Sequence, residues 1–438
     1  MQFFGDEIPP YAILSHTWGK EEVTFQDLQT LEHKSKQGYV KIEQTCRRAA
    51  RKGCEWVWID TCCIDKSSSA ELSEAINSMF EWYQKAEICY VFLADVPPSE
   101  NLEHIFRQAR WLTRGWTLQE FLAPRFISLL NSEWEDINPE NFPFAPLDLR
   151  RVSFEQGLLG YITGINVHRW RDADIPTKLS WAARRQTSRT EDMAYCLLGL
   201  LDINMPLLYG EGTRAFTRLL EEVMKRSNSH GLLAAGYDLP VLPSLHLLPK
   251  SPRAYAACAQ KFSNVPVFGT SKSLHFSMTN AGLNIELPLV NIDNKRKIVL
   301  GLLNCRDVAK LDNPQLAIAL RQANDDRSDQ LYYPVSQPLS VPSDFHQSAC
   351  RENIYIADSR FSRTRCLLAL YYKSLKDIGY QFHSLYPPSL VETIIDMDTS
   401  YIYSEAADTL VLLFTTVIHR PNIVFLVPAS YVAPQASR

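Results

Sequence analysis

Polar residues that could do chemistry follow two short apolar runs early in the chain. His16 could act as an acid or a base, because imidazole titrates near neutral pH; the simpler interpretation is a strand-end histidine bonded to a backbone carbonyl. Asp60 could bind a ribose hydroxyl or cap the turn that follows it. Cys62 and Cys63 could form a thiol hydrolase with His16, but the sequence provides no electropositive setting that would activate them. No Cys/His cluster has zinc spacing, so no metal site is expected.

These polar residues need a framework, which the sequence also predicts. Residues 1–149 alternate short apolar runs, typical of buried strands, with stretches of helical periodicity. Strands are expected at 11–15, 56–59, 88–93 and 126–130, and helices at 41–52, 68–83 and 117–122. This alternation predicts an α/β domain with a parallel sheet covered on both faces. Ligands of such sheets bind beyond the carboxyl ends of the strands, where His16, Trp18, Asp60 and the segment 114–120 are expected.

The rest of the chain divides into a helical part and a β-rich part. Residues 150–229 carry apolar stripes at helical spacing, and Ser188 and Glu191 have the spacing of a capping box at a helix start. The remainder is richer in Pro, Ser and Asn and includes a hairpin that turns at 280–282. We predict three parts: an α/β domain at 1–149, a helical connector at 150–229, and a mostly-β domain at 230–438 built as a sandwich or barrel.

The composition limits the class of protein. The 438 residues include 45 Lys and Arg against 49 Asp and Glu, a net charge of −4, which provides no general attraction to nucleic acid. The first ten residues carry two acids and two prolines, unlike a secretory leader. The longest apolar run, 409–418, is shorter than the ~20 residues that span a membrane. We expect a cytoplasmic protein with reduced cysteines, no membrane span and no nucleic-acid partner.

Three motifs occur in a specific order and spacing: Ser15–Gly19 (SHTWG), Trp58–Lys66 (WIDTCCIDK) and Arg114–Glu120 (RGWTLQE). Together they resemble the fungal heterokaryon-incompatibility (HET) domain. Glu191–Gly199 and Tyr209–Gly212 are similar to the segment that follows this domain in many such proteins. The resemblance implies a role in fungal self/non-self recognition, in which HET domains trigger cell death when incompatible hyphae fuse. Unlike some members, this chain has no GxxxxGK[ST] loop and no 40-residue repeat.

HET domains are in turn similar to TIR domains, which are flavodoxin-like. Tyr11–Ser15 resembles the first TIR strand, and Ile59-Asp60 resembles the second strand with its terminal acid. The stretch Trp116–Phe121 resembles the Trp-Cys-x-x-Glu-Leu stretch whose glutamate is catalytic in NAD-cleaving TIR domains, with Thr117 in place of the cysteine. The resemblance implies a flavodoxin/TIR-like fold and assigns the catalytic role to Glu120.

Cleavage of the nicotinamide–ribose bond requires little from a protein. Nicotinamide leaves as a neutral molecule, so no general acid is needed. A carboxylate near the ribose, here Glu120, would stabilise the oxocarbenium-like transition state. Arg114 could hold a phosphate as a bidentate donor, and Trp18 or Trp116 could stack on a base or on nicotinamide. NAD is then the substrate, and no bound cofactor is required. The expected binding set is His16, Trp18, Asp60, Arg114 and Trp116.

Simpler structural roles compete with these assignments. Glu120 could be a helix acid paired with Arg114 or Arg125, and Trp116 could be a core residue. A solvated helix end, or alternatively an inter-domain salt bridge, is expected for the basic group Arg184, Arg185 and Arg189.

Two hypotheses of different classes follow. In the first, the α/β domain is an NAD-cleaving hydrolase that uses Glu120. In the second, it is a non-catalytic assembly module that binds itself or another incompatibility protein through its surface. The hydrolase needs Glu120, Asp60 and His16 to converge on one open crevice, whereas the module does not.

Overall fold

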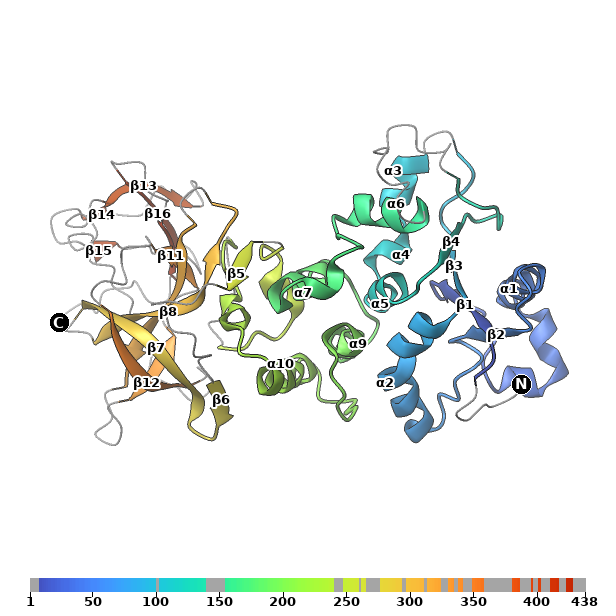
Figure 1. The fold of residues 1–438 in the computed structure, drawn as a ribbon, viewed down its shortest axis with the longest axis horizontal. Helices are drawn as coiled ribbons and strands as arrows, with labels where there is room; N and C mark the ends of the chain where they lie inside the picture. Colours follow the sequence, from blue (N-terminus) through green and yellow to red (C-terminus); the bar gives the residue numbers. More distant parts are fainter. Residues whose placement is uncertain are drawn as a thin grey trace, which may run out of the picture. The chain divides into compact units, whose positions relative to one another are not determined.

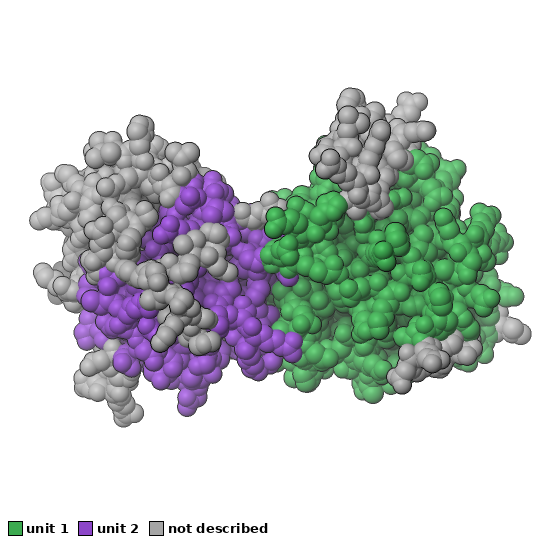
Figure 2. Space-filling view, in the orientation of Figure 1, with its two compact units in different colours: residues 1–173, 184–219 green, residues 174–183, 220–438 purple. Residues whose placement is uncertain are grey.

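Two compact units make up the chain (Figure 2). The first is Met1–Ala173 with Arg184–Leu219, and the second is Asp174–Ala183 with Leu220–Arg438. The computed structural model describes residues 8–99, 102–138, 154–239, 247–259, 261–264, 276–293, 297–310, 313–323, 330–334, 338–341, 349–357, 380–386, 395–396, 401–402, 410–416 and 423–427. The division into 1–149, 150–229 and 230–438 remains a prediction, and its first boundary lies outside the described residues.

A parallel sheet of four strands forms the centre of the first unit (Figure 1). The strand order is β2-β1-β3-β4, with β1 (Tyr11–His16), β2 (Trp56–Ile59), β3 (Ile88–Phe92) and β4 (Ile127–Leu130). Each strand forms at a short apolar run, as the sequence predicts. Because β2 is added on one side of β1 and β3 on the other, the order is flavodoxin-like. A ligand crevice is expected beyond the carboxyl ends of β1 and β3.

Helices cover both faces of this sheet (Figure 1). α1 packs on β1 and β2 from one side, whereas α5 packs on β1 from the other side together with α2. The predicted start of α2 is confirmed, because the Ser68 hydroxyl accepts a hydrogen bond from the Glu71 N–H (3.3 Å). The helices of this part are α1 (Tyr39–Arg51), α2 (Ser69–Lys85), α3 (Leu102–Arg107), α4 (Arg110–Thr113) and α5 (Thr117–Leu122), with short 3-10 helices at Asp27–Gln29 and Leu31–Ser35.

Alternate residues of β1 serve the two faces of the sheet. Ala12 and Leu14 are fully buried in the apolar cluster under α1. The rings of Phe92 and Trp134 stack in the same cluster, with centroids 4.1 Å apart. Ser15 lies on the opposite face, toward α5. One strand therefore carries both an apolar core and the polar residues of the site.

Further helices complete the first unit. α9 packs so closely on α2 that a Cβ added at Gly199 would lie 2.1 Å from the Cβ of Phe80. Glycine is therefore required at this helix contact. The described elements are α6 (Phe154–Thr163), a 3-10 helix at Trp170–Asp172, α8 (Asp192–Tyr195), α9 (Leu198–Leu201) and α10 (Arg214–Arg226), the last of which runs on into the second unit.

Strands dominate the second unit. The pairings β7–β8, β8–β9, β9–β10 and β12–β7 are antiparallel, and the parallel pair β10–β12 closes them into a ring, which is typical of a small barrel. The predicted hairpin is formed by β6 and β7, with Thr279 opposite Gly282. Leu283, Ile285 and Leu287 alternate along β7 and are fully buried, so they contribute to the core of this unit.

The remaining elements of the second unit are as follows. α7 (Ile175–Ala182) packs on 3-10 helices at His230–Ala234 and Pro252–Tyr255. The strands are β5 (Phe262–Asn264), β6 (Phe276–Thr279), β7 (Gly282–Asp293), β8 (Ile298–Asp307), β9 (Gln315–Gln322), β10 (Leu331–Pro334), β11 (Leu339–Val341), β12 (Cys350–Ile356), β13 (Tyr380–Tyr386), β14 (Ile395–Asp396), β15 (Tyr401–Ile402), β16 (Leu410–Thr416) and β17 (Ile423–Val427).

The predicted fold class is confirmed. An α/β part with a parallel sheet is followed by a helical middle and by a C-terminal mixed β-sheet. In the part of the chain that the structure describes, no helix has both the length and the apolar character needed to cross a membrane.

Candidate functional site

Two neighbouring residues at the carboxyl end of β1 organise the site. Ser15 and His16 point to opposite faces of the sheet, because side chains alternate along a strand. On the α5 side, Ser15 is part of what we call the Glu120 network, formed by Ser15, Tyr83, Trp111 and Glu120. On the α1 side, His16 is part of the His16 cluster, formed by His16, Trp18, Glu22, Lys41 and Asp60.

Glu120 lies within α5 and is shielded from solvent, with 5% of its surface exposed. Its Oε2 accepts a hydrogen bond from the Ser15 hydroxyl (2.5 Å), and the Ser15 oxygen accepts one from the indole N–H of Trp111 (2.7 Å). The neighbouring Tyr83 hydroxyl donates to the Leu14 carbonyl oxygen (3.1 Å). Trp111 and Tyr83 are themselves fully buried, so the network is closed on the α5 side of the sheet.

The pKa of Glu120 is strongly raised. Burial raises it from the ordinary 4.5 to about 8, and the negative charge of Asp60 acts in the same direction. The hydrogen bond from Ser15, the neighbouring Tyr83 hydroxyl and the charge of Arg114 oppose the shift without cancelling it. In the described part of the chain Glu120 forms no ion pair, so its predicted pairing with an arginine is wrong. The carboxyl group therefore keeps its proton at neutral pH in this conformation.

His16 lies buried between two carboxylates. Its Nε2 is 3.7 Å from Glu22 Oε2, and its Nδ1 is 3.9 Å from Asp60 Oδ1. These distances allow electrostatic attraction but exceed those of hydrogen bonds. Within the described residues neither ring nitrogen has a hydrogen-bond partner, so the interpretation as a histidine bonded to a backbone carbonyl is wrong. Buried polar groups without partners are uncommon, which makes His16 a position of functional interest.

Glu22 anchors the His16 cluster, although the sequence did not single it out. Its Oε1 accepts hydrogen bonds from the Lys41 ammonium and from the Gly19 N–H (2.5 Å). Burial alone raises the pKa of Glu22, but the contacts with His16, Lys41 and Gly19 outweigh it and lower the pKa to about 2. Glu22 is therefore ionised. No local pattern could have found this contact, because Lys41 comes from α1, well beyond the motif around His16.

Trp18 and Lys66 form the exposed rim of the His16 cluster, beside the half-buried Asp60. The indole N–H of Trp18 donates to Asp60 Oδ2 (2.8 Å), and the residue is 45% exposed. The Lys66 ammonium lies 3.7 Å from the centroid of the indole ring, so a cation covers one face. The structure thus brings His16, Trp18 and Asp60 together, as the positions of the strand ends predict. Their part in binding a nucleotide remains a prediction.

The other two predicted binding residues flank the start of α5. The Arg114 guanidinium donates to the Ser188 hydroxyl (3.3 Å), and the Trp116 side chain hydrogen-bonds the Asp192 carboxylate. Both side chains therefore contact the segment 188–192. Arg114 remains near enough to Glu120 for its charge to lower the pKa of that carboxyl group. Within the described residues, no hydrogen bond or ring contact joins Trp116 to the His16 cluster.

Arg185 is a buried residue that holds the start of α5. The solvated helix end predicted for it is incorrect, because Arg185 is 5% exposed. Its guanidinium donates to the carbonyl oxygen of Arg114 (2.8 Å) and to the hydroxyl of Thr117 (2.9 Å). Burial lowers the pKa of Arg185 to about 10. A Cβ added at Gly115 would lie 2.5 Å from a methyl carbon of Thr187, so this segment packs tightly against the start of α5.

Glu191 also has a different role from the one predicted. The capping box of Ser188 and Glu191 is wrong, because α8 begins at Asp192 and its first turn has no side-chain cap. Instead, Glu191 Oε1 accepts hydrogen bonds from the N–H groups of Gly210 and Gly212 (both 2.9 Å). These contacts explain why the two downstream motifs occur together: one carboxylate fixes the loop of the other.

The two vicinal cysteines have pKa shifts of opposite sign: contact with Cys62 and the hydrogen bond from the Ile59 N–H lower the pKa of Cys63, whereas that of Cys62 is raised. Contact with Cys63 and burial raise the pKa of Cys62 far above its ordinary value, which opposes formation of a thiolate. The Ile59 N–H donates to the Cys63 sulfur (3.4 Å). All cysteines in the described ranges are free. No three His, Cys, Asp or Glu side chains of those ranges are arranged to hold a metal ion.

Comparison with known proteins identifies the domain around this site. Residues 11–105 match the family model of the heterokaryon incompatibility protein (HET), and therefore form a HET domain. The match contains β1 to β3 and ends before the segment 114–120. Vegetative incompatibility protein HET-E-1 of Podospora anserina is 42% identical over 234 residues, which are 50% of this chain but 16% of the relative. The chain thus matches only a small part of that relative's length. No solved structure matches this chain.

Proposed function

We propose that this chain acts in vegetative incompatibility and that its HET domain triggers cell death. The match of residues 11–105 carries this proposal, and the identity with HET-E-1 supports it. Since the alignment covers 16% of that relative, the activity is assigned to the part that the two chains share.

For the mechanism we favour an assembly module that binds a second copy or another incompatibility protein. The supporting observation is the state of Glu120, which is 5% exposed, hydrogen-bonded to Ser15 and protonated at neutral pH. A neutral, shielded carboxyl group does not stabilise a developing positive charge on ribose. The rim formed by Trp18 and Lys66 is exposed and could contact a partner.

NAD cleavage is the second candidate. It is supported by His16, Trp18 and Asp60, which gather at the carboxyl ends of β1 and β2, with Glu120 on the opposite face of the same strand end. The hydrolase would need a movement that exposes Glu120. Exposure removes the main cause of the raised pKa, so the carboxyl group would ionise as it reaches the substrate.

Expression of the full chain in a fungal host tests these proposals. Induction is expected to kill the host, whereas survival with folded protein present would contradict the incompatibility function. Glu120→Gln separates the mechanisms, because glutamine has nearly the shape of the protonated carboxyl group but cannot ionise. The module predicts that this variant still kills and that NAD⁺ stays constant before death. The hydrolase predicts that both death and NAD⁺ loss disappear. The matched control is Glu81→Gln, an exposed acid of α2 paired with Lys85.

A further inference from the structure

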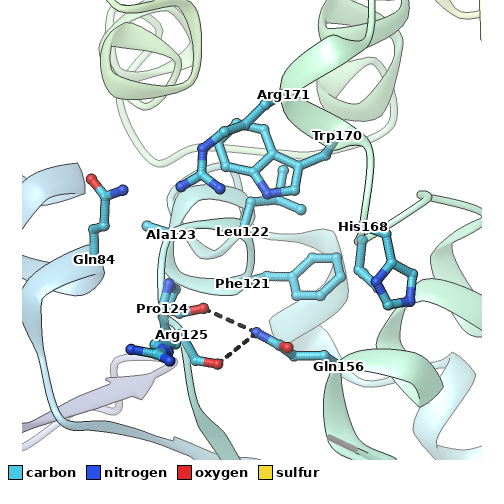
Figure 3. Close-up of a pocket in the computed structure, with 11 residues that line it drawn as sticks. Gln84, Phe121, Leu122, Ala123, Pro124, Arg125, Gln156, His168, Trp170 and Arg171 are labelled. Carbon is cyan, nitrogen blue, oxygen red and sulfur yellow. Dashed lines mark hydrogen bonds between the residues drawn. The ribbon is translucent and has the colours of Figure 1, made fainter. Parts of the chain in front are cut away.

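A cavity of about 420 Å³ in the first unit lies beside Phe121 and Trp170 (Figure 3). Both aromatic side chains are buried, and the Arg171 guanidinium covers the Trp170 ring, 4.5 Å from its centroid. The Gln156 amide donates to the carbonyl oxygen of Pro124 (3.0 Å). The walls of this cavity are therefore held by contacts within the protein, and little of its aromatic surface is open to a ligand.

A cavity of about 450 Å³ in the second unit is built differently, because it lies in the mouth of the barrel. Each of the five strands in the ring brings a lining residue from the same end of the barrel. β7 and β9 contribute near their ends, and β8, β10 and β12 contribute near their beginnings. One such residue from each strand, in the order β7 to β10 and then β12, is Asn291, Val299, Gln322, Tyr332 and Glu352. Mouths of β-barrels are common places for small-molecule sites.

The interior of the barrel changes from apolar to polar toward this mouth. Along β7 the interior-facing Ile285 and Leu287 are fully buried, whereas Asn291, on the same face, is exposed. Along β12 Ile354 lies opposite Ile285 and is fully buried, whereas Glu352 lies opposite Leu287 and is exposed. Apolar side chains therefore fill the barrel below the cavity, and polar side chains line its open end.

Two groups of opposite charge line the mouth. The Lys297 ammonium comes from the turn that leads into β8, and the Glu352 carboxylate comes from β12. Both residues are exposed, and in the described part of the chain neither of them forms an ion pair. The Asn291 amide, which can both donate and accept hydrogen bonds, lines the same cavity. The other lining residues are uncharged, so the mouth offers one positive and one negative group to a ligand.

We propose that the mouth of the barrel binds a small zwitterion, an amino acid or a dipeptide, whose ammonium group meets Glu352 and whose carboxylate meets Lys297. A simple anion or cation would leave one of the two protein charges without a partner, whereas a zwitterion pairs both through charge-assisted hydrogen bonds. The volume lies within the range of small-molecule sites, which supports a ligand of this size rather than a bare ion. The proposal does not depend on the proposed function, because it concerns the second unit.

Isothermal titration calorimetry of the full chain with L-glutamine and with glycylglycine tests this site. The two probes differ in the separation between ammonium and carboxylate, and saturable binding of at least one is expected. The double variant Lys297→Gln/Glu352→Gln should weaken that binding about tenfold or more, because it removes both charged partners. The matched control is Glu286→Gln/Arg351→Gln, which also removes one acid and one base, but from an ion pair that does not line the cavity (3.7 Å).

Two derivatives of the probe that binds separate the charges. Its C-terminal amide keeps the ammonium but lacks the carboxylate, and its N-acetyl form keeps the carboxylate but lacks the ammonium. Each should bind about tenfold more weakly than the zwitterion. Circular dichroism and thermal melting establish that each variant is folded. Absence of saturable binding by both zwitterions, undiminished binding of either derivative, or equal affinity of the two double variants would overturn the proposal.

Discussion

The two faces of β1 hold two shielded carboxyl groups in opposite charge states. Glu120, on the α5 side, has a pKa raised to about 8. Glu22, on the α1 side, has a side chain only 11% exposed, yet its pKa is lowered to about 2. The residues that meet them, Ser15 and His16, are neighbours in the sequence. Burial alone therefore does not decide whether an acid in this domain is charged.

The partners account for the difference. Glu22 has a lysine ammonium, a backbone N–H and an imidazole around it, all of which favour the ionised form. Glu120 has the Ser15 hydroxyl as its hydrogen-bond partner, and the nearby guanidinium of Arg185 donates to a backbone carbonyl and to Thr117. Desolvation therefore dominates at Glu120 and electrostatic attraction dominates at Glu22. The charged face is the one that carries the exposed rim, and the neutral face is part of the core.

Replacing Glu120 should give the largest effect and separates its charge from its shape. Glu120→Ala leaves a cavity and removes the acceptor of the Ser15 hydroxyl, so unfolding should become easier by about 3 kcal/mol. Glu120→Gln keeps the volume and a neutral hydrogen-bonding group, so its cost should stay below about 1 kcal/mol at pH 7. Denaturant unfolding with hydrogen exchange of β1 peptides reports on the first unit separately. Equal costs for both variants would mean that the Glu120 charge is required.

Removing Lys41 tests the opposite face. Lys41→Met leaves Glu22 ionised without its ammonium partner, and we expect a loss of about 2 kcal/mol because both side chains are more than four-fifths buried. The double variant Lys41→Met/Glu22→Gln should recover part of that loss. Lys85→Met is the control, since the Lys85–Glu81 pair is exposed and should contribute less than about 0.5 kcal/mol. A cost for Lys41→Met no greater than that of the control would show that Glu22 does not need a cation.

The pH dependence of stability should have opposite signs on the two faces. The folded pKa of Glu120, about 8, lies above the ordinary 4.5, so between these values the folded state holds a proton that the unfolded state has lost. Stability therefore falls as pH rises through this interval, by about 1 kcal/mol per pH unit and at most about 1.4. The measurement is the unfolding free energy of the wild type minus that of Glu120→Gln from pH 5 to 8.

Glu22 provides the matching measurement at low pH. Its folded pKa, about 2, lies below 4.5, so its contribution is complete above pH 4.5 and is lost as pH falls toward 2. The difference between wild type and Glu22→Gln should therefore be constant above pH 5 and shrink below it. A flat Glu120 difference together with a sloping Glu22 difference above pH 5 would reverse the assignment of the two faces.

The sequence predicted the strands that position this site better than it predicted the charge states of Glu120 and Glu22. Local apolar runs located the strands within one or two residues, and strand ends placed His16, Trp18 and Asp60 at one edge. The hydrogen-bond network of Glu120 was missed, because Ser15 lies 105 positions from Glu120 and Trp111, which donates to Ser15, lies 96 positions from Ser15. The sequence Thr-Leu-Gln-Glu also looks like an ordinary solvent-exposed turn of a helix. The burial of these residues could therefore not be inferred from the local sequence. The roles of Glu22 and Arg185 were missed for the same reason, because their contacts also join positions that are far apart in the sequence.

The smallest expected effect concerns the exposed rim. Lys66 and Trp18 should couple by about 0.5 kcal/mol in a double-mutant cycle of Lys66→Gln and Trp18→Phe, since water screens a cation–π contact at an exposed ring. Trp18→Phe also removes the hydrogen bond to Asp60, which the cycle subtracts because it is present in both arms. The cycle uses the same exchange measurement on β1. A coupling above about 1.5 kcal/mol would mean that water is excluded from the contact between Lys66 and Trp18. The charged face would then be closed to solvent, like the Glu120 network. The proposal that the rim beside His16 contacts a partner would have to be abandoned.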